Sequence, residues 1–213
     1  MGRFFREPAS GFSHLAGAVL SVAALVSLLC VAISNRDVWQ IVSFSIFGAS
    51  MILLYSASAT YHLVNASDKV VKILQKIDHS MIFVLIAGTY TPICLTLLRG
   101  RLGYWLLALI WSCAAAGIVM KMFFFDIPRL LYTGIYLIMG WIAVFVIVPL
   151  YRAGGPLPLV WLLAGGLMYT AGGIIYAVKK PDIFPGWLGF HEIFHIFVIL
   201  GSAAHYVMIL RFC

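Results

Sequence analysis

The chain has 213 residues, of which 63% are hydrophobic and only 10% are charged, and its formal net charge is +7. Soluble domains have about a quarter of their residues charged, so this composition excludes a soluble globular protein. No segment is long and polar enough for a separate soluble domain, and no aromatic–basic pattern suggests nucleic-acid binding. We therefore predict one all-α integral membrane domain over residues 1–213.

Apolar runs of about 20 residues, the length that crosses a hydrocarbon core of about 30 Å, occur seven times along the chain. The first run is longer than the 7–15 apolar residues of a typical signal peptide, so we interpret it as a retained span. None shows the alternation expected of β-barrel strands. The sequence predicts a seven-transmembrane-helix bundle with spans at roughly 11–33, 38–63, 77–98, 102–120, 130–150, 157–178 and 190–210.

Basic residues predict the orientation of this bundle, because they are enriched on the cytoplasmic side. One side carries nine: Arg3, Arg6, Lys69, Lys72, Lys76, Lys121, Arg129, Lys179 and Lys180. The other side carries five: Arg36, Arg99, Arg101, Arg152 and Arg211. We expect a multi-pass protein of the plasma (cell inner) membrane, with a cytoplasmic N-terminus and its C-terminus outside.

Ionisable residues gather at one depth of the predicted bundle. The ends of even-numbered spans meet the starts of odd-numbered spans, so polar residues at these points share one layer. Six residues do so: His14, His62, Asp78, His79, His191 and His195. His205 falls elsewhere, about 15 Å beyond His195 along the last helix. Taken singly, His14, His79 and His205 are typical of interfacial polar residues.

The last span opens with two histidines at positions i and i+4, which places both imidazoles on one helix face. His191 and His195 have the spacing of a common zinc-binding pair. A third ligand must come from another helix, and His62 lies at matching depth. Three histidines leave one tetrahedral position open, as in catalytic zinc sites. Three neutral imidazoles favour Zn²⁺ over copper or magnesium.

Two further side chains at this depth are candidate catalytic residues. Ser58 precedes His62 by four residues and shares its helix face, and Asp78 opens the third span. Either can hold the zinc-bound water or orient a ligand. Ser58 alone also fits a packing serine, whereas a carboxylate inside a membrane, such as that of Asp78, is rarely idle.

The segment "HEIFH" also matches the HExxH pattern of zinc proteases, in which the glutamate is the general base. An intramembrane protease should add a carboxylate ligand from a distant span, often in an Asp-Gly context. The chain contains no Asp-Gly dipeptide, so an intramembrane metalloprotease is the less favoured alternative. Glu192 either assists at the zinc or faces a neighbouring helix.

The motifs together resemble those of the progestin and adipoQ receptor family, in particular its bacterial hemolysin III branch. They are "S-x3-H" from Ser58 to His62, "DHS" at 78–80 followed by "AGTYTP", "H-x3-H" from His191 to His195, and the opening "REPASGFSHLAGA". The resemblance covers essentially the whole chain. It implies a seven-helix bundle with zinc near the inner leaflet, held by those three histidines, with Asp78 and Ser58 close by.

The wider superfamily includes alkaline ceramidases, so the resemblance implies zinc-dependent hydrolysis of a lipid amide or ester, with membrane lipids as partners. Two alternatives remain open at this point. In the first, the protein is a non-enzymatic sensor or regulator of the membrane. In the second, it is a cytolytic protein. The zinc is structural in both.

Overall fold

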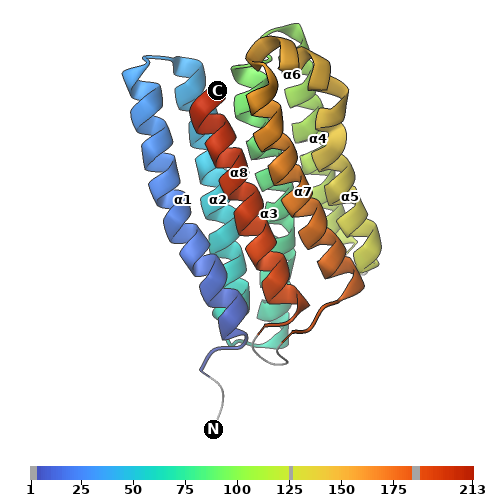
Figure 1. The fold of residues 1–213 in the computed structure, drawn as a ribbon. Coiled ribbons are helices and arrows are strands. Elements are labelled where there is room, and N and C mark those ends of the chain that lie inside the picture. The colour runs from blue at the N-terminus through green and yellow to red at the C-terminus, as the bar shows by residue number, and fades with distance from the viewer. Residues whose placement is uncertain (1–3, 125–126, 184–187) are drawn as a thin grey trace.

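The computed structural model describes residues 4–124, 127–183 and 188–213, and within them every regular element is helical. The chain enters the bundle at Pro8 and leaves it at Phe212, and these two points lie at opposite ends of the bundle (Figure 1). The helices are α1 (Pro8–Ser34), α2 (Val38–Leu63), α3 (Asp68–Leu95), α4 (Arg101–Phe123), α5 (Arg129–Trp141), the 3₁₀ helix η1 (Ile142–Val146), α6 (Ile147–Gly154), α7 (Pro156–Val178) and α8 (Phe190–Phe212).

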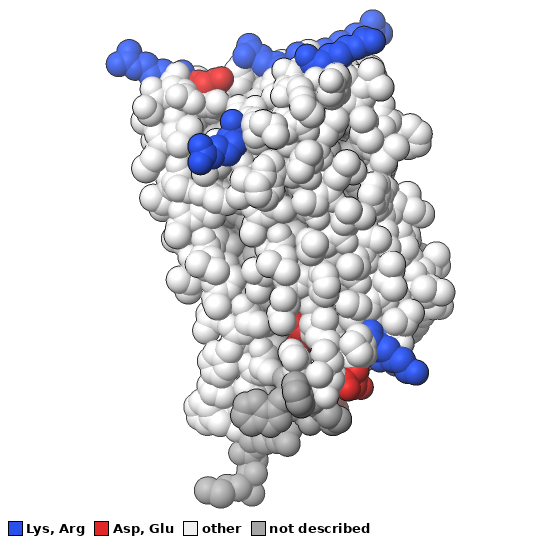
Figure 2. Space-filling model, in the orientation of Figure 1, with Lys and Arg blue, Asp and Glu red and all other residues white. Residues whose placement is uncertain are grey.

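Six helical segments in the described chain are long and apolar enough to cross a membrane: α1, α2, α4, the continuous segment Arg129–Gly154, α7 and α8. On the face shown in Figure 2, charged side chains gather toward the two ends and leave the wall between them almost uncharged. α3 is not among the six and is the least apolar of the long helices, but it packs inside the bundle against α2, α4 and α5. The predicted all-α membrane bundle is therefore confirmed.

α3 begins earlier than the predicted span over 77–98. It starts at Asp68 and runs as one helix to Leu95. The residues from 68 to 76 include no Gly or Pro that would stop a helix, and Ser67 precedes them at the N-cap position. Lys69, Lys72 and Lys76 consequently lie on the first turns of α3.

The segment that contains the predicted span over 130–150 stays helical throughout, but its geometry changes where the 3₁₀ helix η1 lies between α5 and α6. A side chain from α3 contacts this irregular stretch. The hydroxyl of Tyr90 donates to the carbonyl oxygen of Gly140 at 2.7 Å and accepts the N–H of Ala143 at 2.7 Å. A hydroxyl that inserts into the helical ladder is a known cause of such irregularities. The irregularity therefore depends on packing between α3 and α5.

The helices enclose the interior in a ring. α8 packs against α1 on one side and α7 on the other, α7 packs against α5 and α6, and α3 joins α2 to α5. Small residues bring α7 close to α8. A Cβ atom at Gly172 would lie 2.8 Å from Cβ of Phe197, and one at Gly165 would collide with the imidazole of His205.

Candidate metal centre

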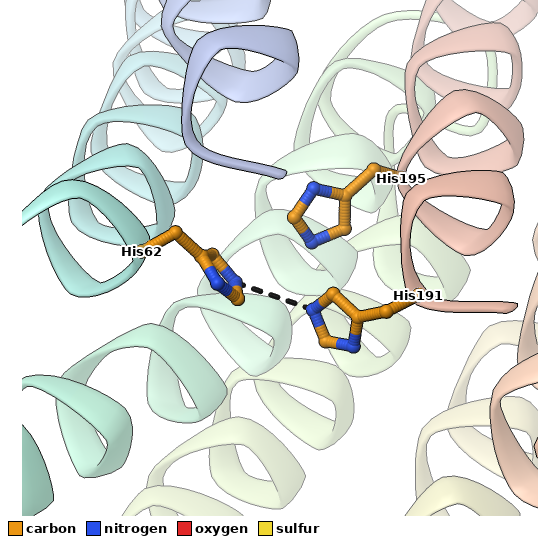
Figure 3. Close-up of side chains that lie close together, drawn as sticks. All are labelled: His62, His191 and His195. Carbon is orange, nitrogen blue, oxygen red and sulfur yellow. Dashed lines mark hydrogen bonds between the residues drawn. The ribbon is translucent and has the colours of Figure 1, made fainter. Parts of the chain in front are cut away.

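Three histidines converge at the end of the bundle where α2 ends and α8 begins (Figure 3). His62 extends from the last turn of α2, and His191 and His195 extend from the first turns of α8. Each offers a ring nitrogen, and these three atoms lie within 4.8 Å of one another. The structure thus brings together the three ligands that the sequence predicts, from positions up to 133 residues apart (195 minus 62).

The spacing of two of the three ring nitrogens fits a small divalent cation. Nε2 of His62 lies 3.2 Å from Nε2 of His191. Zinc–nitrogen bonds of about 2.0–2.1 Å at tetrahedral angles place two ligand nitrogens roughly 3.3–3.4 Å apart. His62 and His195 are almost fully buried and His191 is partly buried, so water competes little for their lone pairs. The residues present therefore fit Zn²⁺.

The outer nitrogens of two of these rings already have acceptors. Nδ1 of His62 donates to the carboxylate of Glu7, and Nδ1 of His195 lies 3.2 Å from the carbonyl oxygen of Ser10. A neutral imidazole that donates from Nδ1 keeps the lone pair of Nε2 for a metal. Such outer hydrogen bonds orient metal ligands and raise their basicity. Both rings are therefore oriented before any ion binds.

Glu7 is the residue that sequence reasoning missed here. Its backbone N–H donates to the carbonyl oxygen of His62 at 2.9 Å, which fixes the start of α1 against the end of α2. The hydrogen bond to His62 holds the pKa of the Glu7 carboxyl below its ordinary value, so the group is ionised at neutral pH. Two signals in the sequence pointed to Glu7: it is a lone acidic residue immediately before the first apolar run, and it belongs to the opening motif "REPASGFSHLAGA".

Asp78 and Ser58 lie beside the histidine cluster, and both are buried. The hydroxyl of Ser58 hydrogen-bonds to the carboxylate of Asp78. Both residues line an internal cavity together with His191 and His195. A carboxylate, its hydroxyl partner and two of the three histidines therefore face one common space.

Lys121 corrects the sequence analysis, which placed it in a connector as one of the charges that set the orientation. It lies in the last turn of α4, and its side chain is only 1% exposed. Its Nζ sits 3.8 Å from the centroid of the Tyr132 ring, a cation–π geometry, and it interacts electrostatically with Asp78. Lys121 is therefore an interior cation on the side of the cavity where Asp78 lies.

Glu192, the glutamate of the HExxH match, is hydrogen-bonded to partners outside the three-histidine cluster. Its carboxylate accepts the hydroxyl of Ser10 on α1 and the backbone N–H of Gly189 at 2.9 Å, so it satisfies a free N–H group at the N-terminus of α8. Successive helical residues diverge by about 100° at 3.6 residues per turn, so Glu192 and His191 face different neighbours. Glu192 thus holds α8 to α1, and the metalloprotease alternative has no free carboxylate at this position.

The remaining histidines occupy different places. His14 stacks on His195 with ring centroids 3.5 Å apart, and His79 faces Tyr132 at 5.5 Å. Both line the same cavity as Asp78. His205 lies farther along α8 and is not part of the three-histidine cluster.

The cavity has a volume of about 160 Å³ and runs between α3, α5, α7 and α8. Its lining includes Asp78 and His195, and also Leu162 of α7 and His205, which lies farther along α8 than His195. At the roughly 10–15 Å³ that one water needs by this measure, the space holds on the order of ten waters or part of a lipid chain. Most of its wall is apolar, which favours the lipid chain.

The fold and the site define a multi-pass membrane protein whose histidine cluster can hold a metal ion beside an apolar internal cavity. The family described as "Haemolysin-III related" matches residues 3–206, so the chain belongs to this family. This confirms the predicted membership of the progestin and adipoQ receptor family through its hemolysin III branch.

Three relatives align with almost the whole chain. "Hemolysin-3 homolog" of Bacillus subtilis (strain 168) is 44% identical over 207 residues, which cover 97% of this chain and 94% of the relative. "Hemolysin-3" of Bacillus cereus is 40% identical over 211 residues, covering 99% of this chain and 93% of the relative. "Monocyte to macrophage differentiation factor" of Homo sapiens is 26% identical over 221 residues, which cover 97% of this chain and 90% of the relative.

Proposed function

We propose that this protein is a zinc-dependent hydrolase of a lipid amide or ester, acting near the cytoplasmic leaflet of the plasma membrane. The observation that carries the proposal is the meeting of His62, His191 and His195 beside a cavity that Asp78 also lines. Pre-oriented imidazoles, a buried carboxylate and an apolar cavity are the parts that metal-assisted hydrolysis of a lipid needs.

His62, His191 and His195 hold the ion in this proposal. Bound zinc supplies a Lewis acid that polarises a carbonyl group and acidifies a water molecule. Asp78 accepts the proton that the attacking water loses and returns it to the leaving amine or alcohol. Ser58 fixes the orientation of that carboxylate through its hydrogen bond. Glu7 keeps the His62 ring turned toward the cluster.

The proposed topology has seven spans, which are the six apolar segments together with α3. It places the N-terminus in the cytoplasm. The sequence has nine basic residues on the predicted cytoplasmic side and five on the other side. Without the buried Lys121, eight remain on the first side (nine minus one), so that side still carries more basic residues and is still expected to be cytoplasmic. The histidine cluster then lies toward the cytoplasmic leaflet. The lipid head group meets Asp78, and its chain extends along the cavity toward the bilayer centre.

A specific observation also favours a structural role for zinc, as a second candidate function. α2 and α8 pack against each other only weakly, whereas both pack closely against α1. An ion held by His62 and by the two histidines of α8 would join these helices directly, as structural zinc does. The protein would then be a zinc-stabilised sensor, regulator or cytolytic protein without turnover.

The deciding experiment measures metal content and turnover on the same purified samples. Wild type is expected to retain about one zinc per chain, His62→Ala to lose it, and Asp78→Asn to retain it. Given a panel of ceramides, other N-acyl lipids and lipid esters, Asp78→Asn should hydrolyse its substrate about 10²–10⁴-fold more slowly than wild type. Zinc in wild type with no turnover on any lipid would reject the hydrolase and support the structural role.

A further inference from the structure

His205 is a buried histidine that lines the cavity and lies outside the candidate metal centre. It lies on α8 ten residues beyond His195, which is about 15 Å along the helix axis. Its side chain is 6% exposed and lines the same cavity as Asp78. The ring packs on Gly165 of α7, where any Cβ atom would collide with it, so its position is tightly defined.

The hydrogen bonds of His205 leave one nitrogen unused. Nε2 lies 3.3 Å from the carbonyl oxygen of Leu162, and since a carbonyl only accepts, Nε2 carries the hydrogen. In the neutral ring, Nδ1 is then an acceptor. It is buried and has no partner among the described residues. Buried polar atoms normally have a partner, so this lone pair points to a missing donor.

The other polar groups at this depth are already paired with one another. Ser202, three residues before His205 on the same face of α8, has its Oγ 2.7 Å from the hydroxyl of Tyr55. The hydroxyl of Tyr169 lies 2.8 Å from the same oxygen. The ring of Tyr169 also covers His205, with centroids 5.4 Å apart. The donor that Nδ1 lacks must therefore arrive through the cavity.

We propose that Nδ1 of His205 accepts a hydrogen bond from a hydroxyl group carried midway along the acyl chain of a bound lipid. This inference rests on the proposed function for the orientation of the lipid, whose polar head lies at the histidine cluster. An extended chain of roughly eleven methylene groups spans the same length as ten helical residues, about 15 Å. An unsubstituted chain leaves the nitrogen unpaired and binds less tightly, because a buried acceptor without a partner is penalised.

The test is a binding measurement that does not depend on hydrolysis. Purified zinc-loaded protein is titrated with octadecanoic acid, 12-hydroxyoctadecanoic acid and 16-hydroxyoctadecanoic acid, each competing with a fluorescent fatty acid. The 12-hydroxy acid is expected to bind about five- to tenfold more tightly than the unsubstituted acid, the value of one net hydrogen bond. The 16-hydroxy isomer places its hydroxyl beyond His205 and should gain nothing.

Two variants assign the effect to His205. His205→Leu should bind the 12-hydroxy and unsubstituted acids equally, with its zinc content unchanged. Tyr206→Phe is the matched control, because it removes a hydroxyl from the next residue of α8 that bonds to Ser27 and does not line the cavity. It should keep the wild-type preference.

Equal binding of the 12-hydroxy and unsubstituted acids by the wild type overturns the inference, and this comparison needs no variant to fold. The same preference in His205→Leu also overturns it. A clear preference together with no turnover on any lipid would reject the hydrolase and leave the hydroxyl site standing. Turnover with no preference among these acids would reject the hydroxyl site and leave the hydrolase standing.

Discussion

Glu7 offers the sharpest test of how the metal centre is built. The carboxylate accepts Nδ1–H of His62, which is one of the three proposed ligands, and no other described side chain bonds to that nitrogen. Removing such an outer partner typically lowers metal affinity 10–100-fold. The Glu7 side chain is 46% exposed, so water and salt screen its charge and the lower end applies. Glu7→Ala should therefore weaken zinc binding by about tenfold, or about 1.4 kcal/mol.

The amide variant separates charge from orientation. Glu7→Gln retains an oxygen that accepts Nδ1–H, so it should weaken zinc binding only by about two- to threefold. The assay is competition for zinc with a chromophoric chelator, on protein purified in detergent. Asp68→Asn is the matched control, because it removes an acidic charge from the first turn of α3 without touching the cluster. An affinity of Glu7→Ala within twofold of wild type, or an equal loss in Asp68→Asn, would refute the reasoning.

Three further predictions concern stability. Gly165→Ala should lower the free energy of unfolding by about 1–3 kcal/mol by overpacking α7 against α8, while Gly166→Ala, with open space around its Cβ, should be neutral in the same thermal melts. Zinc at a hundred times its dissociation constant should add about 2.7 kcal/mol, a gain that a chelator abolishes in wild type and that His62→Ala never shows. Tyr90→Phe should cost about 1–3 kcal/mol, measured by the same melts, because Ala143 N–H loses its acceptor.

The histidine cluster was predictable because it follows from two regularities. Alternating spans bring the end of the second and the start of the seventh to one depth, and the i, i+4 spacing places His191 and His195 on one face. Neither step needs knowledge of the packing between helices. The sequence therefore predicted the three histidines that the structure brings together.

The groups around the ligands were not predictable, because they depend on tertiary packing. Lys121 lies at the end of an apolar helix, where a lysine normally reaches water, and its burial beside the Tyr132 ring and Asp78 depends on residues of other helices. Glu7 reaches His62 because the chain before α1 folds over the end of α2. The irregularity between α5 and α6 likewise depends on Tyr90 from another helix. Periodicity within one helix contains none of this information.

The metal centre joins both ends of the chain, and this has a consequence for folding. Ser10 bonds to Glu192 across 182 residues, and His62 meets His191 across 129. Contacts of such long sequence separation form late, since the loop entropy between them is lost before they add stability. The site therefore cannot exist until the last helix has inserted beside the first. A metal ion bound there would stabilise only the fully assembled bundle, so we expect metal binding to report completed folding whether or not the site also performs chemistry.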